Sequence, residues 1–185
     1  MHRVSVVGAS GSGKSTLARR LAQRLGAPHV ELDALHWGPG WTPRPPADLE
    51  ADTRAALSGE TWVVDGNYSE LRPLIWARAD TVVWVDPPRP LVLARVYRRS
   101  FRLAATQEEL WPGTGNRQPW RDVLMPWVKD SIVRWSWSEL RKHPERYGAA
   151  MHDPEYAHLT FHHVRTRRAV EELVAGASPG PAPRS

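Results

Sequence analysis

The strongest constraint on the fold of this chain is a short pattern near its amino terminus. Residues 3–7, Arg-Val-Ser-Val-Val, form a β-branched run that is typical of a buried strand. Residues 15–25 carry apolar side chains at helical spacing, and Gly26 ends the predicted helix. A glycine-rich segment lies between the two. The order strand, loop, helix therefore predicts an α/β unit at the start of the chain.

The glycine-rich segment, residues 8–15, reads Gly-Ala-Ser-Gly-Ser-Gly-Lys-Ser and fits the pattern GxxxxGK[ST] at every fixed position. Glycines let backbone N–H groups approach phosphate oxygens, and the following helix N-terminus adds positive potential. We expect Lys14 to reach the β- and γ-phosphates and the Ser15 hydroxyl to bind Mg²⁺. A chance glycine-rich turn is the alternative. The correct flanks on both sides favour a nucleoside triphosphate site.

Four more apolar runs predict strands, and amphipathic segments between them predict helices. The predicted strands are residues 29–32, 61–65, 81–86 and 157–164. The predicted helices are residues 47–57, 90–103, 120–142, with a kink at Pro126, and 166–175. Alternation of this kind indicates a parallel sheet with helices on both faces. The expected class is therefore α/β, a three-layer α/β/α P-loop NTPase fold with a five-stranded parallel sheet and a helical lid.

Length and composition limit the organisation further. The 185 residues suit one domain over residues 1–175, with an acceptor-side insert at about 34–60 and a lid at about 104–119. Residues 176–185, rich in Pro, Gly and Ser, are predicted to be a disordered tail. The absence of cysteine excludes disulfides and thiolate zinc sites. Without an apolar run of about 20 residues or room for a signal peptide, we expect a cytoplasmic protein with no membrane association.

Acidic residues follow three of the predicted strands, and in parallel sheets ligands bind beyond the carboxyl ends of the strands. Asp65 is the better candidate to hold Mg²⁺ together with Ser15; a turn-forming role is its alternative. Asp86 precedes Pro87 and is interpreted as a cap for the next helix. Asp33 is predicted to orient an acceptor hydroxyl or to act as its general base, against the alternative of a solvated loop carboxylate.

Two other groups of side chains surround this predicted site. Trp37 and Trp41, in a proline-bounded segment, suit an aromatic wall for a flat acceptor, and equally suit pinning of the loop to the body. Four arginines share one face of the predicted helix 90–103: Arg95, Arg98, Arg99 and Arg102. Such a face is usually solvated. Beside a mobile cap that closes over a triphosphate, such arginines favour a catalytic role instead, and we select Arg95 and Arg99 of this face together with Arg117 of the cap.

The residues of four segments resemble the adenylate-kinase-like group of small P-loop kinases, including bacterial proteins often labelled DNA topology modulation protein or adenylate kinase and related kinases. The matching segments are residues 6–16, residues 32–37 (Leu-Asp-Ala-Leu-His-Trp), residues 62–68 (Trp-Val-Val-Asp-Gly-Asn-Tyr) and residues 85–88 (Val-Asp-Pro-Pro). The likeness covers residues 1–105, and only the general layout agrees beyond them.

The resemblance implies ATP and Mg²⁺ as cofactors, an acceptor site around Asp33, and lid arginines at Arg95 and Arg99. The implied ATP-binding residues are Gly8, Ala9, Ser10, Gly11, Ser12, Gly13, Lys14, Ser15 and Thr16. The implied acceptor residues are Asp33, Trp37, Gly66, Asn67 and Tyr68. One departure stands out. Nucleoside monophosphate kinases have Asp-Gly-Phe-Pro-Arg where residues 65–69 read Asp-Gly-Asn-Tyr-Ser, so the arginine that binds the acceptor phosphate is missing.

The leading hypothesis is a kinase that transfers the γ-phosphoryl group of ATP to a small acceptor, a nucleoside, nucleotide or other metabolite. Two alternatives remain open. One is a polynucleotide 5′-hydroxyl kinase, which the formal net charge of +5 permits. The other is a nucleotide-dependent regulatory ATPase that binds a partner or DNA. Nucleic acid is the less favoured partner, because the arginines cluster where phosphate chemistry is expected.

Overall fold

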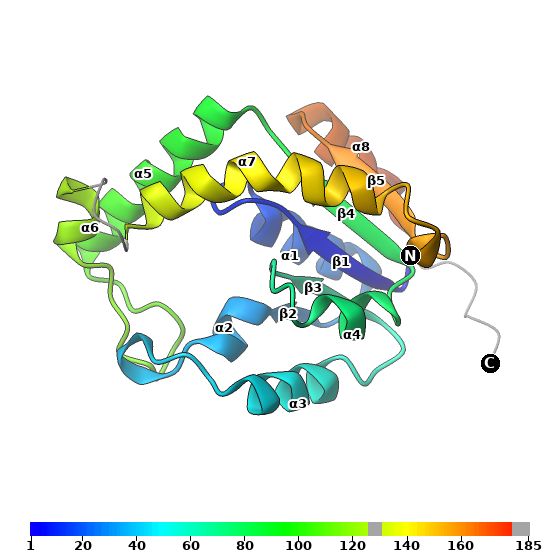
Figure 1. The fold of residues 1–185 in the computed structure, drawn as a ribbon, viewed down its shortest axis with the longest axis horizontal. Coiled ribbons are helices and arrows are strands. Elements are labelled where there is room, and N and C mark those ends of the chain that lie inside the picture. The colour runs from blue at the N-terminus through cyan, green and yellow to red at the C-terminus, as the bar shows by residue number, and fades with distance from the viewer. Residues whose placement is uncertain (126–130, 179–185) are drawn as a thin grey trace.

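The computed structural model describes residues 1–125 and 131–178. A five-stranded sheet with the strand order β2-β3-β1-β4-β5 forms its centre, and every neighbouring pair is parallel (Figure 1). The strands are β1 (Arg3–Val7), β2 (His29–Glu31), β3 (Trp62–Asp65), β4 (Thr81–Val85) and β5 (Thr160–Val164). The predicted α/β class and the five-stranded parallel sheet are confirmed.

Helices connect the strands and cover both faces of the sheet. They are α1 (Lys14–Leu25), α2 (Leu32–His36), α3 (Pro46–Ala56), α4 (Arg72–Trp76), α5 (Arg89–Thr106), α6 (Trp120–Leu124), α7 (Ile132–Ala150) and α8 (Arg167–Gly176), with 3₁₀ turns η1 (Pro39–Trp41) and η2 (Pro154–Tyr156). Within the described ranges, none of these helices combines the length and the apolar character that a membrane crossing needs.

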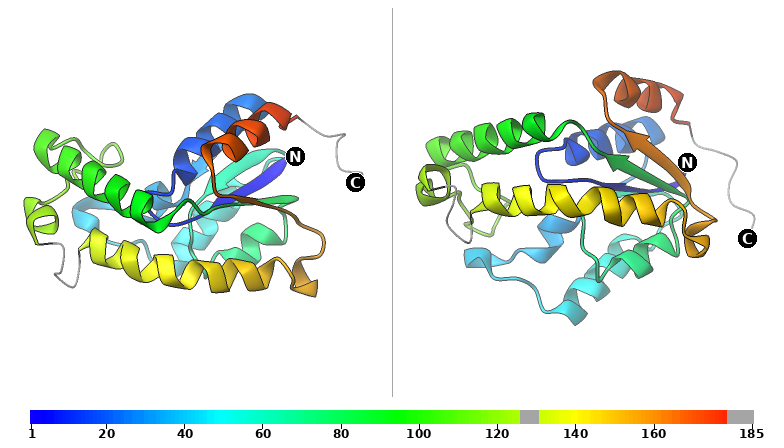
Figure 2. Two further views of the ribbon diagram at one scale, coloured as in Figure 1. Left: turned by 90° about the horizontal axis from the view of Figure 1, so that it is seen from above. Right: turned by 45° about the horizontal axis from the view of Figure 1, so that its top comes forward.

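Strand alternation divides the core into two layers, one on each face of the sheet. Val4, Val63 and Val83 face α1 and α8, and buried side chains of α1 with partly buried ones of α8 complete that cluster. Trp62 and Trp84 point to the opposite face, where α4 and the end of α7 cover them. Figure 2 shows α1 and α8 on one side of the sheet and α7 on the other. The structure is therefore three-layered, as predicted.

The carboxyl ends of the strands bring the candidate site together. In the sheet register, Asp65 lies opposite Val6 of β1 on one side and Glu31 of β2 on the other. The segment between β1 and α1, the short α2 and the start of α5 all follow from strand ends at this edge. Segments 37–43 and 107–119 lie side by side beyond it, at the left of Figure 1.

Several predicted boundaries are wrong. The second strand ends at Glu31, and residues 32–36 form a helical turn in which the Trp37 N–H donates to the Asp33 carbonyl. Helix α4 was not predicted, because a five-residue helix carries too little periodicity to detect. The last strand begins at Thr160 and not at residue 157, since η2 and its following turn occupy the preceding residues.

Differences also occur in the carboxyl-terminal half. The predicted helix 120–142 is divided into α6 and α7, and its expected kink at Pro126 lies outside the described residues. Helix α7 continues through Pro144 to Ala150. The predicted disordered tail begins with residues that are ordered: α8 extends to Gly176, and Ala177 is buried in the core. The rest of that tail, residues 179–185, lies outside the described residues.

Candidate functional site

The glycine-rich loop joins β1 directly to α1 and leaves the helix N-terminus open. Gly13 precedes α1 in a left-handed conformation with φ of 101°, and among the described residues no side chain caps this helix. The first-turn N–H groups of a helix have no intrahelical acceptor. An uncapped N-terminus of a twelve-residue helix is therefore suited to an anion such as a phosphate group.

Helix α5 packs closely against this loop. Gly11 has φ of 79°, and a Cβ there would lie 2.6 Å from Val96 Cγ2 and 2.8 Å from the Val92 carbonyl oxygen. Glycine is thus required at residue 11 for both conformation and space. The same contact brings Arg95 to the loop, where its guanidinium donates to the Ser12 carbonyl at 3.2 Å.

A hydroxyl and a carboxylate meet at the start of α1. The Ser15 Oγ donates to Asp65 Oδ2 at 2.5 Å, and the Asp65 side chain is only 2% exposed. The contact joins α1 to the end of β3, as the sheet register requires. Mg²⁺ prefers oxygen ligands of this kind and usually combines one or two protein groups with phosphate oxygens. The two residues predicted to hold the metal therefore fit it.

The Asn67 side chain forms hydrogen bonds with both backbone groups of Gly8, the first glycine of the loop. Its Oδ1 accepts from the Gly8 N–H at 3.0 Å, and its Nδ2 donates to the Gly8 carbonyl at 2.6 Å. The Tyr147 hydroxyl of α7 donates to the same Oδ1 at 3.1 Å. The two donors fix the orientation of the amide, because a flipped amide would direct its NH₂ group at them. Asn67, predicted as an acceptor residue, contacts the phosphate loop in this structure.

Asp33 lies in the first turn of α2, with its carboxylate held by a tyrosine. The Tyr68 hydroxyl donates to Asp33 Oδ1 at 2.9 Å. Burial, with the charge of Asp33 as a smaller cause, raises the pKa of Tyr68 well above its ordinary value. Tyr68 is therefore a phenol at neutral pH and a fixed hydrogen-bond donor. The other oxygen of Asp33 has no hydrogen-bond partner among the residues that the structure describes.

An aromatic row runs from Tyr68 through His36, Trp37 and Trp41 to Trp111. Successive rings along it have centroids 4.8, 4.6, 5.7 and 5.8 Å apart. Its last member lies in residues 107–119, called the lid segment here because they form most of the predicted lid, and the others lie in or beside the predicted acceptor-side residues. The predicted wall of Trp37 and Trp41 is therefore part of a longer row.

One buried amide joins the lid segment to the acceptor side. Asn116 is 1% exposed. Its Oδ1 accepts from the Trp41 N–H at 2.8 Å, and its Nδ2 donates to the Gly38 carbonyl at 3.0 Å. The lid segment is thereby docked on η1 through backbone groups, and the aromatic row is continuous across the junction.

Other predicted residues lie differently. The Arg117 guanidinium donates to the Gln107 carbonyl of its own segment, and Arg99 is exposed on α5, one turn beyond Arg95. Gly66, with φ of 150°, packs against Leu32, whose side chain would lie 2.8 Å from a Cβ at that position. The prediction that Asp86 caps α5 is wrong. Pro88 precedes that helix, and Asp86 pairs with His163 at 3.0 Å.

Three residues that contact the site were not predicted from the sequence: His29, Tyr147 and Asn116. His29 Nε2 lies 2.9 Å from Asp65 Oδ1. The alternation of His29 and Glu31 along a strand that leads to the site was a usable signal. Tyr147 and Asn116 reach the site from distant segments, and no local pattern indicated either contact.

Comparisons with known proteins agree with this geometry. Residues 4–81 match a family model described as an AAA domain. Two proteins named "Putative adenylate kinase", from Pyrococcus furiosus and Thermococcus onnurineus, are each 30% identical to this chain over 105 residues. The aligned part is 53% of this chain and 56% of each relative. The chain thus spans about half the length of the curated relatives that it matches.

Among solved structures, a shikimate kinase from Acinetobacter baumannii in complex with shikimate is similar with a TM-score of 0.54 at 17% identity. The alignment covers 95% of this chain and 89% of that one, and at this identity it concerns the fold alone. The predicted resemblance to adenylate-kinase-like small P-loop kinases is confirmed by the sequence relatives and the shared fold.

Proposed function

We propose that this chain, which resembles the adenylate-kinase-like small P-loop kinases in sequence and fold, transfers the γ-phosphoryl group of ATP to a hydroxyl group of a small acceptor. The observation that carries the proposal is the contact between Ser15 and Asp65 beneath an uncapped helix N-terminus. A hydroxyl, a buried carboxylate and free N–H groups are what a magnesium triphosphate requires.

Positive charge beside the loop suits phosphoryl transfer. When bound, magnesium ATP supplies the phosphoryl group, and ADP leaves. Lys14, the first residue of α1, is proposed to neutralise phosphate oxygens, and Arg95 adds a guanidinium that donates to the Ser12 carbonyl. Such reactions depend mainly on positioning and on stabilising the charge of the transferred group. Arg99 and Arg117 remain candidates for the same role if the lid segment rearranges.

Asp33 is the proposed general base. The acceptor O–H bond breaks, its proton passes to Asp33, and the acceptor oxygen forms the new bond to phosphorus while the bond to the ADP oxygen breaks. Tyr68 holds one carboxylate oxygen of Asp33 at 2.9 Å and orients the other. General base catalysis of this kind typically contributes about 10²–10⁴-fold in rate.

The acceptor side favours a ligand recognised by its ring and hydroxyl groups. The aromatic row offers ring faces beside Asp33. Arg72, which follows Tyr68 by four residues, has its guanidinium over the rings of Trp76 and Tyr147, at 5.2 and 5.7 Å from their centroids. Its placement does not replace the arginine that is missing from residues 65–69.

The test is ADP release from MgATP across a panel of hydroxyl acceptors that includes nucleosides, nucleotides, polyols and 5′-hydroxyl oligonucleotides. We expect one small acceptor to stimulate ADP release well above the rate without acceptor. Asp33→Asn should reduce stimulated turnover by about 10²-fold or more while the affinity for MgATP stays nearly unchanged. Asp52→Asn is the matched control, an exposed carboxylate on α3 that pairs with Arg44.

Other outcomes would replace the proposal. Full turnover of Asp33→Asn would remove Asp33 from the acceptor site. Slow hydrolysis of ATP at a rate that no acceptor changes would favour the regulatory ATPase. Stimulation by oligonucleotides alone, falling steeply as salt rises, would favour the polynucleotide kinase.

A further inference from the structure

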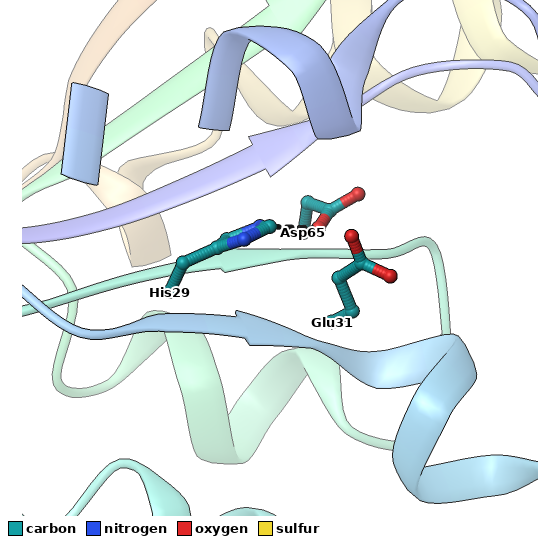
Figure 3. Close-up of side chains that lie close together, drawn as sticks. All are labelled: His29, Glu31 and Asp65. Atoms are coloured by element: carbon teal, nitrogen blue, oxygen red, sulfur yellow. Dashed lines mark hydrogen bonds and ion pairs between the residues drawn. The ribbon is translucent and has the colours of Figure 1, made fainter. Parts of the chain in front are cut away.

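Three potential metal ligands lie together beside the proposed magnesium position. In the register of β2 and β3, Glu31 is opposite Asp65 and His29 is opposite Val63. Because side chains alternate along a strand, His29 and Glu31 project to the same face, and Asp65 joins them from the neighbouring strand. Figure 3 shows the three side chains converging on one space beside the start of α1.

The distances suit a shared cation. One nitrogen and two carboxylate oxygens, one ligand atom from each residue, lie within 4.8 Å of one another. The His29 and Asp65 side chains are 16% and 2% exposed, so two of the ligands are largely withdrawn from water. Glu31 is 33% exposed, and the ion pair that it forms with Arg19 is 3.5 Å long on the surface. It can turn toward the other two ligands at little cost.

Charge also favours a cation over a hydrogen bond alone. The bond between His29 and Asp65 would by itself give His29 only an orienting role. A hydrogen bond alone would leave the Glu31 carboxylate beside the buried carboxylate of Asp65, and like charges at this separation repel each other. A divalent ion among the three ligands compensates both carboxylates and uses the imidazole nitrogen as a ligand.

We propose that His29, Glu31 and Asp65 bind a divalent transition-metal ion at a site distinct from the proposed magnesium position. Asp65 is common to both positions, with Oδ1 toward His29 and Oδ2 toward Ser15. An imidazole ligand favours ions such as Zn²⁺, Co²⁺ or Fe²⁺ over Mg²⁺, which prefers oxygen. The site does not require the phosphoryl transfer reaction, because its three ligands belong to the protein.

The test is calorimetric titration of the nucleotide-free, full-length chain with Co²⁺, in the presence of excess Mg²⁺. We expect one Co²⁺ per chain and a matching change in visible absorption. Loss of a ligand should weaken binding by at least about tenfold in both His29→Ala and Glu31→Gln. Glu31 is partly exposed, so Glu31→Gln leaves the core intact. His163→Ala is the matched control, because His163 also pairs with an aspartate, at 3.0 Å.

A further variant separates this site from the proposed function. Ser15→Ala should lose magnesium-dependent ATP binding and retain Co²⁺ binding. The proposal is overturned if the wild-type chain does not bind Co²⁺, if excess Mg²⁺ displaces it, or if His29→Ala and Glu31→Gln both bind as the wild type does.

Discussion

At the scale of single residues, Asn67 connects the two halves of the site. Its amide holds both backbone groups of Gly8, and Tyr147 holds the amide in turn. Gly8 is the first residue of the phosphate loop, so its orientation affects the N–H groups that follow it. Asn67 is therefore expected to contribute to nucleotide affinity without touching the nucleotide.

Asn67→Ala should weaken MgATP binding about tenfold. The two hydrogen bonds to Gly8, worth about 1 kcal/mol each, are lost together with the one from Tyr147, and part of that loss appears as a looser loop. Asn67→Asp should weaken binding further, because a carboxylate oxygen would face the Gly8 carbonyl and a negative charge would lie near the phosphates. Tyr147→Phe, which removes the hydrogen bond to the Asn67 amide and leaves both bonds between Asn67 and Gly8, should have a smaller effect.

Calorimetry with MgATP, combined with thermal unfolding of the same variants, checks this prediction. A purely structural role would lower the melting temperature of Asn67→Ala and leave the dissociation constant for MgATP at its wild-type value. That result would contradict the role assigned to Asn67.

At the scale of secondary-structure elements, the success of prediction from the sequence depended on the length of each element and on the elements that flank it. The β-branched runs of β1, β3 and β4 are buried on both faces and were readily identified. The phosphate loop was identifiable because a motif of fixed spacing joins two clear elements. Helix α2 was missed because a single helical turn is stabilised by tertiary packing, here of Leu32 against Gly66, and not by local periodicity.

Helix α7 was misjudged for a similar reason. Its prediction ended near Lys142, yet the helix passes through Pro144 and packs Tyr147 and Ala150 against the sheet. Burial of those side chains outweighs the hydrogen bond that proline cannot donate. Because the last two turns of α7 were not predicted, the contacts that they make with the site were not predicted either. They depend on residues about 80 positions apart, as in the bond between Tyr147 and Asn67.

Helix α7 also makes the stability of the fold sensitive to acid. His143 is 2% exposed, and burial lowers its pKa from 6.5 to about 4. The charges of Glu139 and Asp86 oppose this shift, and that of Arg146 supports it. The native state therefore keeps His143 neutral where the unfolded chain binds a proton. Its contribution to stability is complete above pH 6.5 and is lost as pH falls toward 4.

We expect this residue to lower the free energy of unfolding by about 2 kcal/mol between pH 7.5 and pH 5. His143→Gln should remove that part of the pH dependence. Urea unfolding at the two pH values measures it, with His152→Gln, an exposed histidine just beyond α7, as the control. An equal loss of stability in wild type and His143→Gln would show that His143 is not the group responsible.

At the scale of the whole molecule, parallel strand order explains why distant residues share one site. Because β3 lies between β2 and β1, Asp65, Glu31 and the phosphate loop lie together at the carboxyl end of the strands. Sequence patterns indicated that strand ends would meet, and so predicted Ser15 with Asp65 as the metal-binding pair. They gave no strand order. The contact of His29 with Asp65 and the docking of Asn116 on η1 therefore required the structure.

The proposed function depends on a magnesium-bound triphosphate held by the loop at residues 8–15 together with Asp65. Calorimetric titration of the folded chain with ATP, with and without Mg²⁺, tests it most directly. We expect one site per chain whose affinity for ATP rises with Mg²⁺, is lost in Lys14→Ala, and loses its Mg²⁺ dependence in Asp65→Asn. Absence of binding by wild type, or wild-type affinity in Lys14→Ala, would contradict it.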